Sequence, residues 1–488
     1  MPLRVLRWLA VALAVSLLGA FEGSHLMASL NDPVPGVLEA LHASADPPAP
    51  HPRPPARRVV VVLIDGLGGD AFDALLRDGM LGDVAWRASL DSGVPSRSRP
   101  VYHALLTGVP QWVAGIRGNG YAGGRADSVA DRVRDAGGKV AWMLETVPWF
   151  CELFCAQGDV VVEGQDVTSP ATFERVWDTA PDLLVVHLTE VDEVGHLHGA
   201  NSGEYEATSR WAMGLVAAFR AVASHKPGGD GAIWFVGADH GHTPHGGHGG
   251  AEEEVRRVSW IGLFDQGSRA EGVASSVPPM TPVTSLAPTI ARALGVDGPR
   301  ESMANGLPLS TARPGAPFQA SAARIRAVEA ARAASDARWI GNARSRAMLI
   351  VGTLLATFAA VIGFRRRRGV AETAVFVVAI GGFLAVGPGL SMSSVRTEGW
   401  YLTHGLLTLT VFATVAWAVA RRWASPLLVA AVCVMFPVLA LVAMRGSLGR
   451  SDVTPLESVL WPSLGLVPAS VCAAIALIEG WAFLRARS

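Results

Sequence analysis

Short apolar runs alternate with amphipathic segments between about residues 58 and 309. The apolar runs predict buried β-strands, at Val59–Ile64, Lys139–Leu144, Asp182–His187, Ala232–Val236 and Val258–Phe264. The amphipathic segments predict helices, at Ala71–Arg77, Ser128–Ala136, Glu204–Ala223 and Leu286–Leu294. Buried strands joined by crossover helices form a mostly parallel sheet with helices on both faces, so the expected fold class is α/β. In such sheets, functional sites lie beyond the carboxyl ends of the strands.

A different pattern begins near residue 347. Five long apolar runs follow one another, at about 347–364, 371–390, 401–420, 425–443 and 459–484. Each is close to the length that crosses a bilayer as a helix. Buried core helices are the alternative, but five such runs in succession favour the membrane. We therefore expect residues 347–488 to form an all-α transmembrane bundle.

Three shorter segments connect or precede these parts. Arg4 and Arg7 stand before the apolar run Trp8–Phe21, so residues 1–25 are expected to be a signal peptide or a signal anchor. Residues 26–57 include a proline-rich stretch and are expected to form a stiff linker. The α/β domain then covers 58–312, and the segment 313–346, rich in alanine and arginine, is expected to be a helical connector.

Arginines flank the long apolar runs unevenly. Clusters follow the first, third and fifth runs, at Arg365–Arg368, Arg421, Arg422, Arg485 and Arg487, whereas the opposite loops hold only Arg396, Arg445 and Arg450. Because cytoplasmic loops carry the excess of basic residues, the α/β domain is predicted to lie outside, in agreement with Arg4 and Arg7 staying inside. The sequence thus predicts an integral protein of a bacterial plasma membrane, in contact with membrane lipids, with its α/β domain extracytoplasmic.

Composition agrees with a soluble part joined to a membrane part. Hydrophobic residues make up 50% of the 488 residues, and the mean hydropathy is +0.32. The formal net charge of −1 argues against an electrostatic nucleic-acid binder. Cys433 and Cys472 lie in apolar runs, where thiols are inert. Cys151 and Cys155 are four residues apart, and either a local disulfide or two free thiols fits the sequence.

Acidic residues and histidines follow three of the predicted strands. Asp65 comes directly after the first strand, and Asp239 and His240 follow Ala232–Val236. Asp192 and His196 are spaced i, i+4, so on a helical turn both side chains face one way and suit a single metal. His248 lies in a glycine-rich loop after Asp239. Histidines clustered in a core cost stability unless they are paired or bound to metal, so this pattern indicates a metal site.

One more segment, Pro95-Ser96-Arg97-Ser98-Arg99-Pro100, stands before a predicted helix. A serine entering a helix lies among backbone N–H groups that attract an anion. Serine is a weak nucleophile unless a base or a metal activates it. Alone, this serine fits a helix cap equally well.

Together these motifs resemble the alkaline phosphatase superfamily, especially its nucleotide pyrophosphatase/phosphodiesterase branch and the GPI ethanolamine phosphate transferases. The family pattern has an Asp after the first strand, a Thr or Ser two residues before a proline, then D-x-x-x-H, D-H-G and a final His beside glycine. This chain matches it, in order, at Asp65, Ser98, Asp192, His196, Asp239, His240 and His248. The resemblance covers about residues 58–310 and implies an alkaline-phosphatase-like fold.

The resemblance implies a role for each matching residue. One of two divalent metal ions, zinc or alternatively manganese, would be bound by Asp65, Ser98, Asp239 and His240, and the other by Asp192, His196 and His248. Ser98 would be the nucleophile, and Asn119 would contact the substrate phosphate. Arg97 and Arg99 are candidates for binding an anionic part of the substrate. His198, His242 and His245 are not expected to be primary ligands, although His245 is an alternative to His248.

The expected function is phosphoester hydrolysis or phosphoryl transfer by a membrane-anchored enzyme. The layout resembles the GPI ethanolamine phosphate transferases, which favours a lipid-linked or head-group phosphodiester substrate. A tethered phosphodiesterase, nucleotide pyrophosphatase or phosphatase acting on soluble substrates is the alternative, and a non-catalytic membrane scaffold is a further one. Tyr102 stands where the sulfatase motif has Arg, which argues against a sulfatase. The membrane runs argue against a cytoplasmic phosphoglycerate mutase.

Overall fold

The computed structural model describes residues 34–337, apart from 35, 49–54, 56, 83, 117, 120–124, 146–147, 251, 265–276, 309–317 and 336. These residues belong mainly to one compact unit, Asn31–Ala333. The predicted signal segment and the five long apolar runs lie outside the described residues. Among the described helices, none has the length and apolar character needed to cross a bilayer.

The centre of the unit is an eight-stranded sheet with the order β4-β3-β5-β1-β6-β7-β2-β8. The strands are β1 Val59–Ile64, β2 Val84–Asp91, β3 Val140–Leu144, β4 Val160–Glu163, β5 Leu183–Leu188, β6 Ile233–Gly237, β7 Arg257–Phe264 and β8 Thr281–Pro282. Strands β4, β3, β5, β1 and β6 pair in parallel. Strand β7 is antiparallel to both of its neighbours. The prediction of a mostly parallel sheet is therefore confirmed.

Burial explains which strands the sequence indicated. All six residues of β1 are buried, because helices cover both faces, and its apolar run is unbroken. The sequence analysis did not predict β2, β4 and β8. In β2 an exposed Arg87 interrupts the apolar pattern, and in β4 partly buried residues alternate with exposed ones at the edge of the sheet. Edge strands pack on fewer neighbours, so their apolar signal is weaker.

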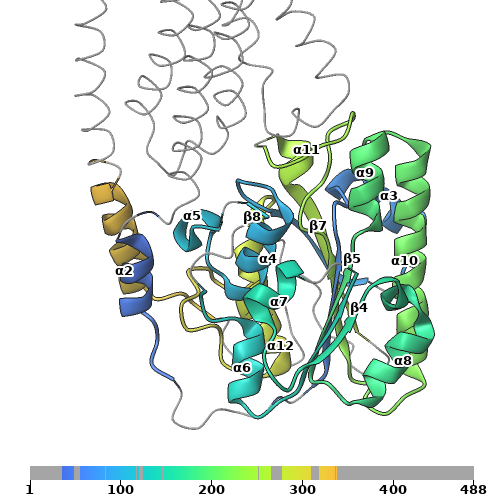
Figure 1. Ribbon diagram of the computed structural model, residues 1–488, viewed down its shortest axis with the longest axis horizontal. Helices are drawn as coiled ribbons and strands as arrows, with labels where there is room; N and C mark the ends of the chain where they lie inside the picture. The colour runs from blue at the N-terminus through green and yellow to red at the C-terminus, as the bar shows by residue number, and fades with distance from the viewer. Residues whose placement is uncertain are drawn as a thin grey trace, which may run out of the picture. The chain divides into compact units, whose positions relative to one another are not determined.

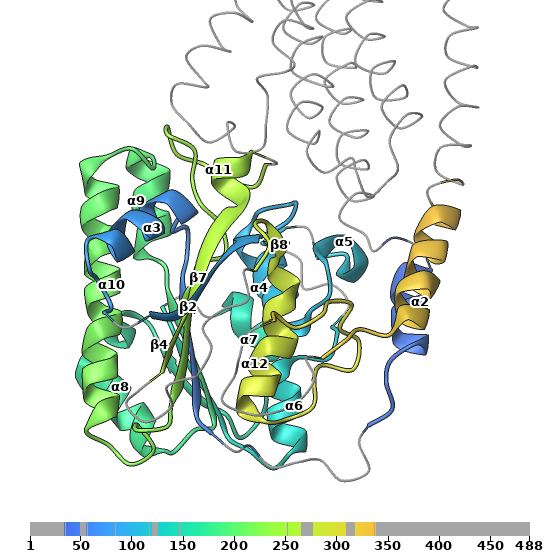
Figure 2. The same ribbon diagram turned by 180° about the vertical axis from the view of Figure 1, so that it is seen from behind.

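Helices cover both faces of the sheet, as predicted (Figures 1 and 2). One face carries α3 Gly69–Arg77, α8 Pro170–Asp178, α9 Glu190–His198 and α10 Gly203–Ser224. The other carries α4 Ser98–Thr107, α6 Val129–Asp135, α7 Pro148–Phe154 and α12 Leu286–Leu294. Shorter helices are α2 Val37–Ala43, α5 Gln111–Ala114 and α11 Glu253–Arg256, with 3-10 turns η1 Gln165–Thr168 and η2 Val283–Ser285.

A further helix, residues 322–335, follows the last labelled element. Its Arg324 is fully buried and donates to the backbone oxygens of Ser44 and Ser302. The same guanidinium pairs with Asp46 at 2.6 Å. Because a buried arginine is costly to leave unpaired, these contacts fasten the start of this helix to the compact unit.

Candidate metal centre

The parallel register brings three strand ends to one edge of the sheet. Ile64, at the end of β1, pairs with Leu188 of β5, and Leu63 pairs with Gly237 of β6. Asp65 follows β1, Asp239 follows β6 closely, and α9 begins just after β5. Polar residues that are far apart in the sequence therefore meet beyond the carboxyl ends of the central strands, as this sheet topology predicts.

Ser98 enters the same place from α4. It is the first residue of that helix and is buried, with Arg97 as the N-cap. The first turn of a helix leaves backbone N–H groups without helical partners, and they favour negative charge. A phosphate oxygen or a serine alkoxide at this helix end is therefore in a favourable field.

The first set of candidate ligands is Asp65, Ser98, Asp239 and His240, called here the buried group. His240 Nε2 lies 3.2 Å from Ser98 Oγ, 3.2 Å from Asp65 Oδ1 and 3.3 Å from Asp239 Oδ2. A tetrahedral metal with ligands at about 2.0–2.1 Å has ligand–ligand edges of about 3.3 Å. The spacing in the buried group therefore fits a bound metal ion such as zinc.

Two carboxylate oxygens of the buried group support this fit. Asp65 Oδ1 and Asp239 Oδ2 are buried and make no hydrogen bond within the described part of the chain. A buried carboxylate oxygen without a partner costs free energy. A cation between the two carboxylates removes that cost, and so the residues present fit a metal.

The second set, Asp192, His196 and His248, is called the open group. His196 Nε2 lies 3.4 Å from Asp192 Oδ2, and His248 Nε2 lies 3.5 Å from Asp192 Oδ1. The two imidazole Nε2 atoms are 3.2 Å apart. These spacings also match the edges of a tetrahedral site. The Asp192 and His196 side chains are 17% and 23% exposed, so this group is open to solvent.

Backbone contacts orient two of the imidazoles. His248 Nδ1 donates to the Ser96 carbonyl at 3.0 Å, and His240 Nδ1 lies 3.3 Å from the Gly241 carbonyl. A ligating histidine typically donates its second ring N–H in this way, which leaves the Nε2 lone pair for the metal. The Ser96 hydroxyl in turn donates to Gly250 and accepts from the Gly249 N–H. Ser96 thus holds the glycine-rich loop, and Ser98 is the serine at the ligands.

Burial and neighbouring charges set the protonation of the centre. Burial lowers the pKa of His240 to about 4, and burial together with the charge of His240 lowers the pKa of His248 well below its usual range. Burial and the Asp65 charge raise the pKa of Asp239 well above normal. Burial raises the pKa of Asp192, but hydrogen bonds from His196 and His242 outweigh it and lower that pKa well below normal. Neutral imidazoles beside carboxylates are the form in which both bind metals.

Two residues that the sequence analysis missed lie behind Asp65. The Tyr102 hydroxyl donates to Asp65 Oδ2, and His187 Nε2 lies 3.0 Å from the same oxygen and 2.8 Å from that hydroxyl. These contacts engage Oδ2 and turn Oδ1 towards His240. A histidine at the end of the otherwise apolar β5 was a signal that could have revealed His187.

His242, which the sequence analysis did not expect to be a primary ligand, lies close to one of the candidate ligands. Its ring is buried, and Nε2 lies 2.9 Å from Asp192 Oδ1. Asp192, His196 and His242 form one of the groups in the described residues that could hold a metal. His198 and His245 are exposed, as expected for histidines that are not primary ligands.

The three residues predicted to bind the substrate, Asn119, Arg99 and Arg97, have different surroundings in the structure. Asn119 Oδ1 accepts from the Arg99 N–H at 3.1 Å, which leaves the Nδ2 N–H groups as the part of this amide that can donate to an anion. Arg99 is 2% exposed, donates to the Asn119 carbonyl and pairs with Glu152. This pairing does not fit the predicted contact with a substrate anion, because the guanidinium instead joins α4 to α7. Arg97 lies against Gly118 and Gly249, beside both loops of the site.

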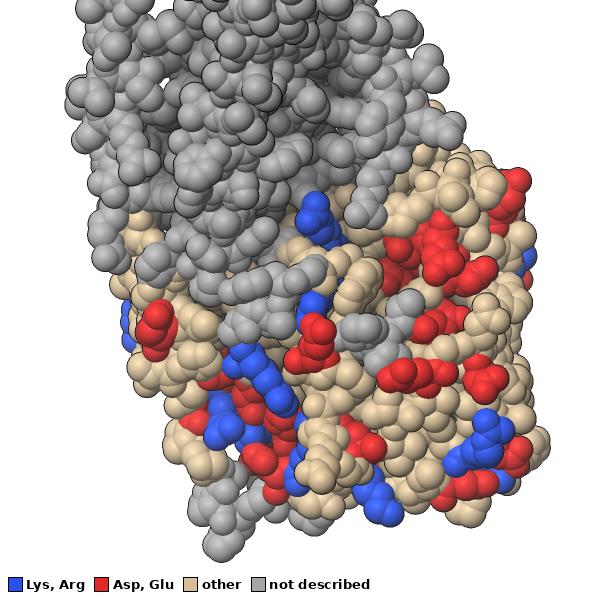
Figure 3. Space-filling view, viewed as in Figure 1, with Lys and Arg blue, Asp and Glu red and all other residues tan. Residues whose placement is uncertain are grey.

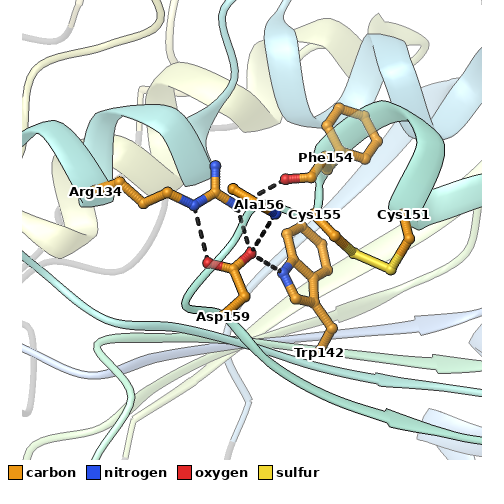
Figure 4. Close-up of a disulfide and its surroundings, with 7 residues drawn as sticks. All are labelled: Arg134, Trp142, Cys151, Phe154, Cys155, Ala156 and Asp159. Atoms are coloured by element: carbon orange, nitrogen blue, oxygen red, sulfur yellow. Dashed lines mark hydrogen bonds and ion pairs between the residues drawn. A yellow bond between two sulfur atoms is a disulfide. The ribbon is translucent and has the colours of Figure 1, made fainter.

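A disulfide joins Cys151 and Cys155 on and just after α7, which decides between the two alternatives that the sequence left open. Figure 4 shows the residues next to it. Asp159 accepts hydrogen bonds from Arg134, the Trp142 indole and the Ala156 N–H. Besides the Glu152 contact, α7 stacks Phe150 on Tyr102 with ring centroids 4.3 Å apart. The disulfide-linked helix therefore supports the residues that hold Asp65.

Comparisons with known proteins place this geometry in context. No family model matches the chain. It is 26% identical over 255 residues to human GPI ethanolamine phosphate transferase 1, a match that covers 42% of this chain and 26% of that protein. The chain thus spans about a quarter of the length of this curated relative. The match confirms the resemblance to the GPI ethanolamine phosphate transferases that the motifs indicated.

Solved structures show weaker similarity. The chain is 16% identical to murine ectonucleotide pyrophosphatase / phosphodiesterase 5, with a TM-score of 0.33 over 38% of this chain and 58% of that one. For the C-terminal periplasmic domain of EptC from Escherichia coli the identity is 12% and the TM-score 0.36, over 50% of this chain and 84% of that one. For a phosphonate monoester hydrolase from Silicibacter pomeroyi the identity is 13% and the TM-score 0.41, over 54% of this chain and 78% of that one.

Proposed function

We propose that this chain is a metal-dependent phosphoester hydrolase or phosphotransferase with Ser98 as its nucleophile. The observation that carries the proposal is the buried group, where Ser98 Oγ lies 3.2 Å from His240 Nε2 beside two carboxylate oxygens that make no hydrogen bond with any described residue. A serine among metal ligands at a helix N-terminus is arranged for activation as an alkoxide. The curated relative is an ethanolamine phosphate transferase, which supports the same class of chemistry.

The proposed reaction has two displacements. Ser98 Oγ attacks the phosphorus of a phosphodiester, the bond to the first alcohol breaks and that alcohol leaves with the serine proton, and a phosphoryl-Ser98 ester forms that still carries the second ester group. Water or a second alcohol then attacks that phosphorus and releases Ser98. Two divalent cations, zinc or manganese, would lower the pKa of the serine and stabilise the leaving oxygen. Asn119 would donate from Nδ2 to a non-bridging oxygen, held in place by Arg99.

The membrane setting of this activity is also a proposal. Arginine placement around the five long apolar runs supports an integral protein of the bacterial plasma membrane with the α/β domain outside. The Cys151–Cys155 disulfide agrees with an oxidising, extracytoplasmic compartment. An active site on a chain that also carries a membrane anchor favours a substrate in that membrane, such as a lipid head-group or lipid-linked phosphodiester.

Charge near the open group favours an ethanolamine-type substrate over a nucleotide. Glu190 and Glu193 are exposed on α9, the helix that carries Asp192 and His196. On the face drawn in Figure 3, acidic side chains gather where Figure 1 places α9 and α10. An acidic rim attracts a cationic head group and repels a polyanionic nucleotide. We therefore favour phosphoethanolamine-type transfer and keep a tethered phosphodiesterase, nucleotide pyrophosphatase or phosphatase acting on soluble substrates as the second candidate.

The test uses the full-length protein in detergent. Metal content is measured together with the release of p-nitrophenol from bis-p-nitrophenyl phosphate and p-nitrophenyl phosphate, beside Ser98→Ala and Ser98→Thr. We expect about two metals per chain, diester activity, and a loss of roughly 10³-fold or more in Ser98→Ala. Ser98→Thr, which keeps a hydroxyl, should retain part of the activity.

The outcomes separate the candidates. Turnover of phosphatidylethanolamine but not of a dinucleotide or nucleotide ester supports the head-group transferase, and the reverse preference supports the tethered phosphodiesterase that acts on soluble substrates. A wild-type protein that binds neither zinc nor manganese and turns over no ester would instead be a non-catalytic scaffold. Full activity in Ser98→Ala would contradict the proposed nucleophile.

A further inference from the structure

The His242 ring lies against two glycines that are far from it in the sequence, and a side chain at either glycine would clash with the ring. A Cβ added to Gly195 would lie 2.4 Å from His242 Cδ2, and one added to Gly66 would lie 2.9 Å from His242 Nε2. Both distances are shorter than real Cβ atoms allow. Gly66 also has a φ of +74°, which favours glycine. The chain therefore has a slot for an imidazole ring next to the open group.

The His242 ring faces the same carboxylate as the other imidazoles. Nε2 of His242 lies 2.9 Å from Asp192 Oδ1, the oxygen that is 3.5 Å from His248 Nε2. The ring centroids of His242 are 4.9 Å from His196 and 5.2 Å from His248. The three imidazoles and the Asp192 carboxylate thus surround one small volume.

The spacings fit a metal with four protein ligands. For bonds of about 2.0–2.1 Å, five-coordinate zinc has ligand–ligand edges from about 2.9 Å at right angles to about 3.5 Å at 120°. His242 Nε2 and His248 Nε2 lie 2.9 and 3.5 Å from Asp192 Oδ1. His196 Nε2 lies 3.4 Å from Asp192 Oδ2, the other oxygen of that carboxylate, and 3.2 Å from His248 Nε2. Because His248 Nδ1 donates to Ser96, its Nε2 carries a lone pair towards this volume. A cation in this volume would be bound by that lone pair and by the Asp192 carboxylate.

We infer that His242 is a fourth protein ligand of the metal in the open group and makes that position selective for zinc. The inference deepens the proposed function and rests on it. With His242, the open group offers three imidazoles and one carboxylate, whereas the buried group offers two carboxylates, one serine oxygen and one imidazole. Imidazole favours zinc, and oxygen ligands favour manganese and magnesium. The two positions should therefore differ in metal preference.

The test measures metal binding rather than activity. Metal-free full-length protein is equilibrated with zinc in excess manganese, and the bound metals are counted for the wild type, His242→Ala and His242→Gln. Glutamine keeps an amide donor for Asp192 but is a poor zinc ligand. His245→Ala, an exposed histidine of the same loop, is the matched control. Cobalt absorption spectra report the coordination number directly, and circular dichroism checks that each variant is folded.

We expect the wild type and His245→Ala to retain one zinc against manganese, and both His242 variants to bind this zinc more than about 100-fold more weakly. That loss exceeds the 10–100-fold typical of residues that only orient a ligand. If His242→Gln has the zinc affinity and cobalt spectrum of the wild type and His242→Ala does not, His242 only orients Asp192 and the inference is wrong. The inference is also wrong if both variants have the zinc affinity and cobalt spectrum of the wild type. Absence of metal from the wild type would instead count against the proposed function.

Discussion

The buried and open groups lie side by side but are built from different parts of the fold. In the buried group the side chains of Asp65, Asp239 and His240 are at most 2% exposed, and the first two follow central strands closely. In the open group Asp192 and His196 are 17% and 23% exposed and stand on α9. Rigid strand ends hold two adjacent carboxylates that a cation would stabilise, whereas a helix and a loop carry the candidate ligands that are partly open to solvent. The two groups should therefore respond differently to substitution.

The largest effect should come from Asp239→Asn. Removing this carboxylate leaves Asp65 without its partner ligand in a dry site, so we expect the metal of the buried group to be lost and diester activity to fall by about 10³-fold or more. The zinc of the open group should remain. Metal analysis and turnover are measured beside Asp230→Asn, an exposed control. Two retained metals in Asp239→Asn would contradict the assignment of the buried group.

His196→Ala should have a smaller and reversible effect. Because the His196 side chain is partly exposed and other ligands remain, we expect zinc affinity of the open group to fall by about 100-fold and activity to return at high zinc. The measurement is a zinc titration of activity, with His198→Ala on the same helix as the control. If added zinc does not restore activity in His196→Ala, the predicted difference between the two groups is wrong. It is also wrong if added zinc restores activity in Asp239→Asn.

His103 can be compared with the histidines of the two groups, because its imidazole is also buried but is not one of the candidate ligands. Its Nε2 has no hydrogen bond among the described residues, and burial lowers its pKa to about 3. The unfolded chain takes up this proton first, so stability should be lost as pH falls from about 6.5 towards 3. At pH 5 the loss is about 2 kcal/mol.

The corresponding variant is His103→Phe, which packs beside Phe154. Denaturation of metal-free protein at pH 7.5 and pH 5 should show that this variant loses about 2 kcal/mol less than the wild type between the two values. His225→Phe, exposed at the end of α10, is the control. An equal loss of stability in wild type and His103→Phe would show that His103 is protonated in the folded protein at pH 5.

The smallest effect should come from Tyr102→Phe. This change removes only the hydroxyl that bonds Asp65 Oδ2, while His187 still contacts that oxygen. We expect about a 10-fold loss of metal affinity in the buried group, as for residues that orient a metal ligand. Competition with a chromophoric chelator measures it. Unchanged affinity would show that His187 alone positions Asp65.

The sequence indicated those parts of the site that depend on local pattern. Asp65 and the pair Asp239-His240 could be predicted because each follows an unbroken apolar run, and a strand end fixes where such side chains lie. Asp192 and His196 could be predicted from their i, i+4 spacing on a helix. The same reasoning identified the central strands, since buried strands have the strongest apolar signal.

The rest depends on contacts between distant segments. The slot for His242 is made by Gly66 and Gly195, which no local pattern connects to the glycine-rich loop. Arg99 was a candidate for binding the substrate because it flanks Ser98, and the structure pairs it with Glu152, 53 residues later in the chain. Such pairings follow from packing of α7 on α4 and cannot be read from spacing.

The most direct test of the central claim is to trap the proposed phosphoryl-Ser98 ester. Metal-loaded wild-type protein is mixed with bis-p-nitrophenyl phosphate, quenched in acid within the first turnover, and digested for peptide mass spectrometry. We expect a p-nitrophenyl phosphoryl adduct, which has lost one p-nitrophenol and kept the other, on the peptide that contains Ser98, localised to that residue, and its absence in Ser98→Ala. Turnover without any adduct, or an adduct on another residue, would contradict it.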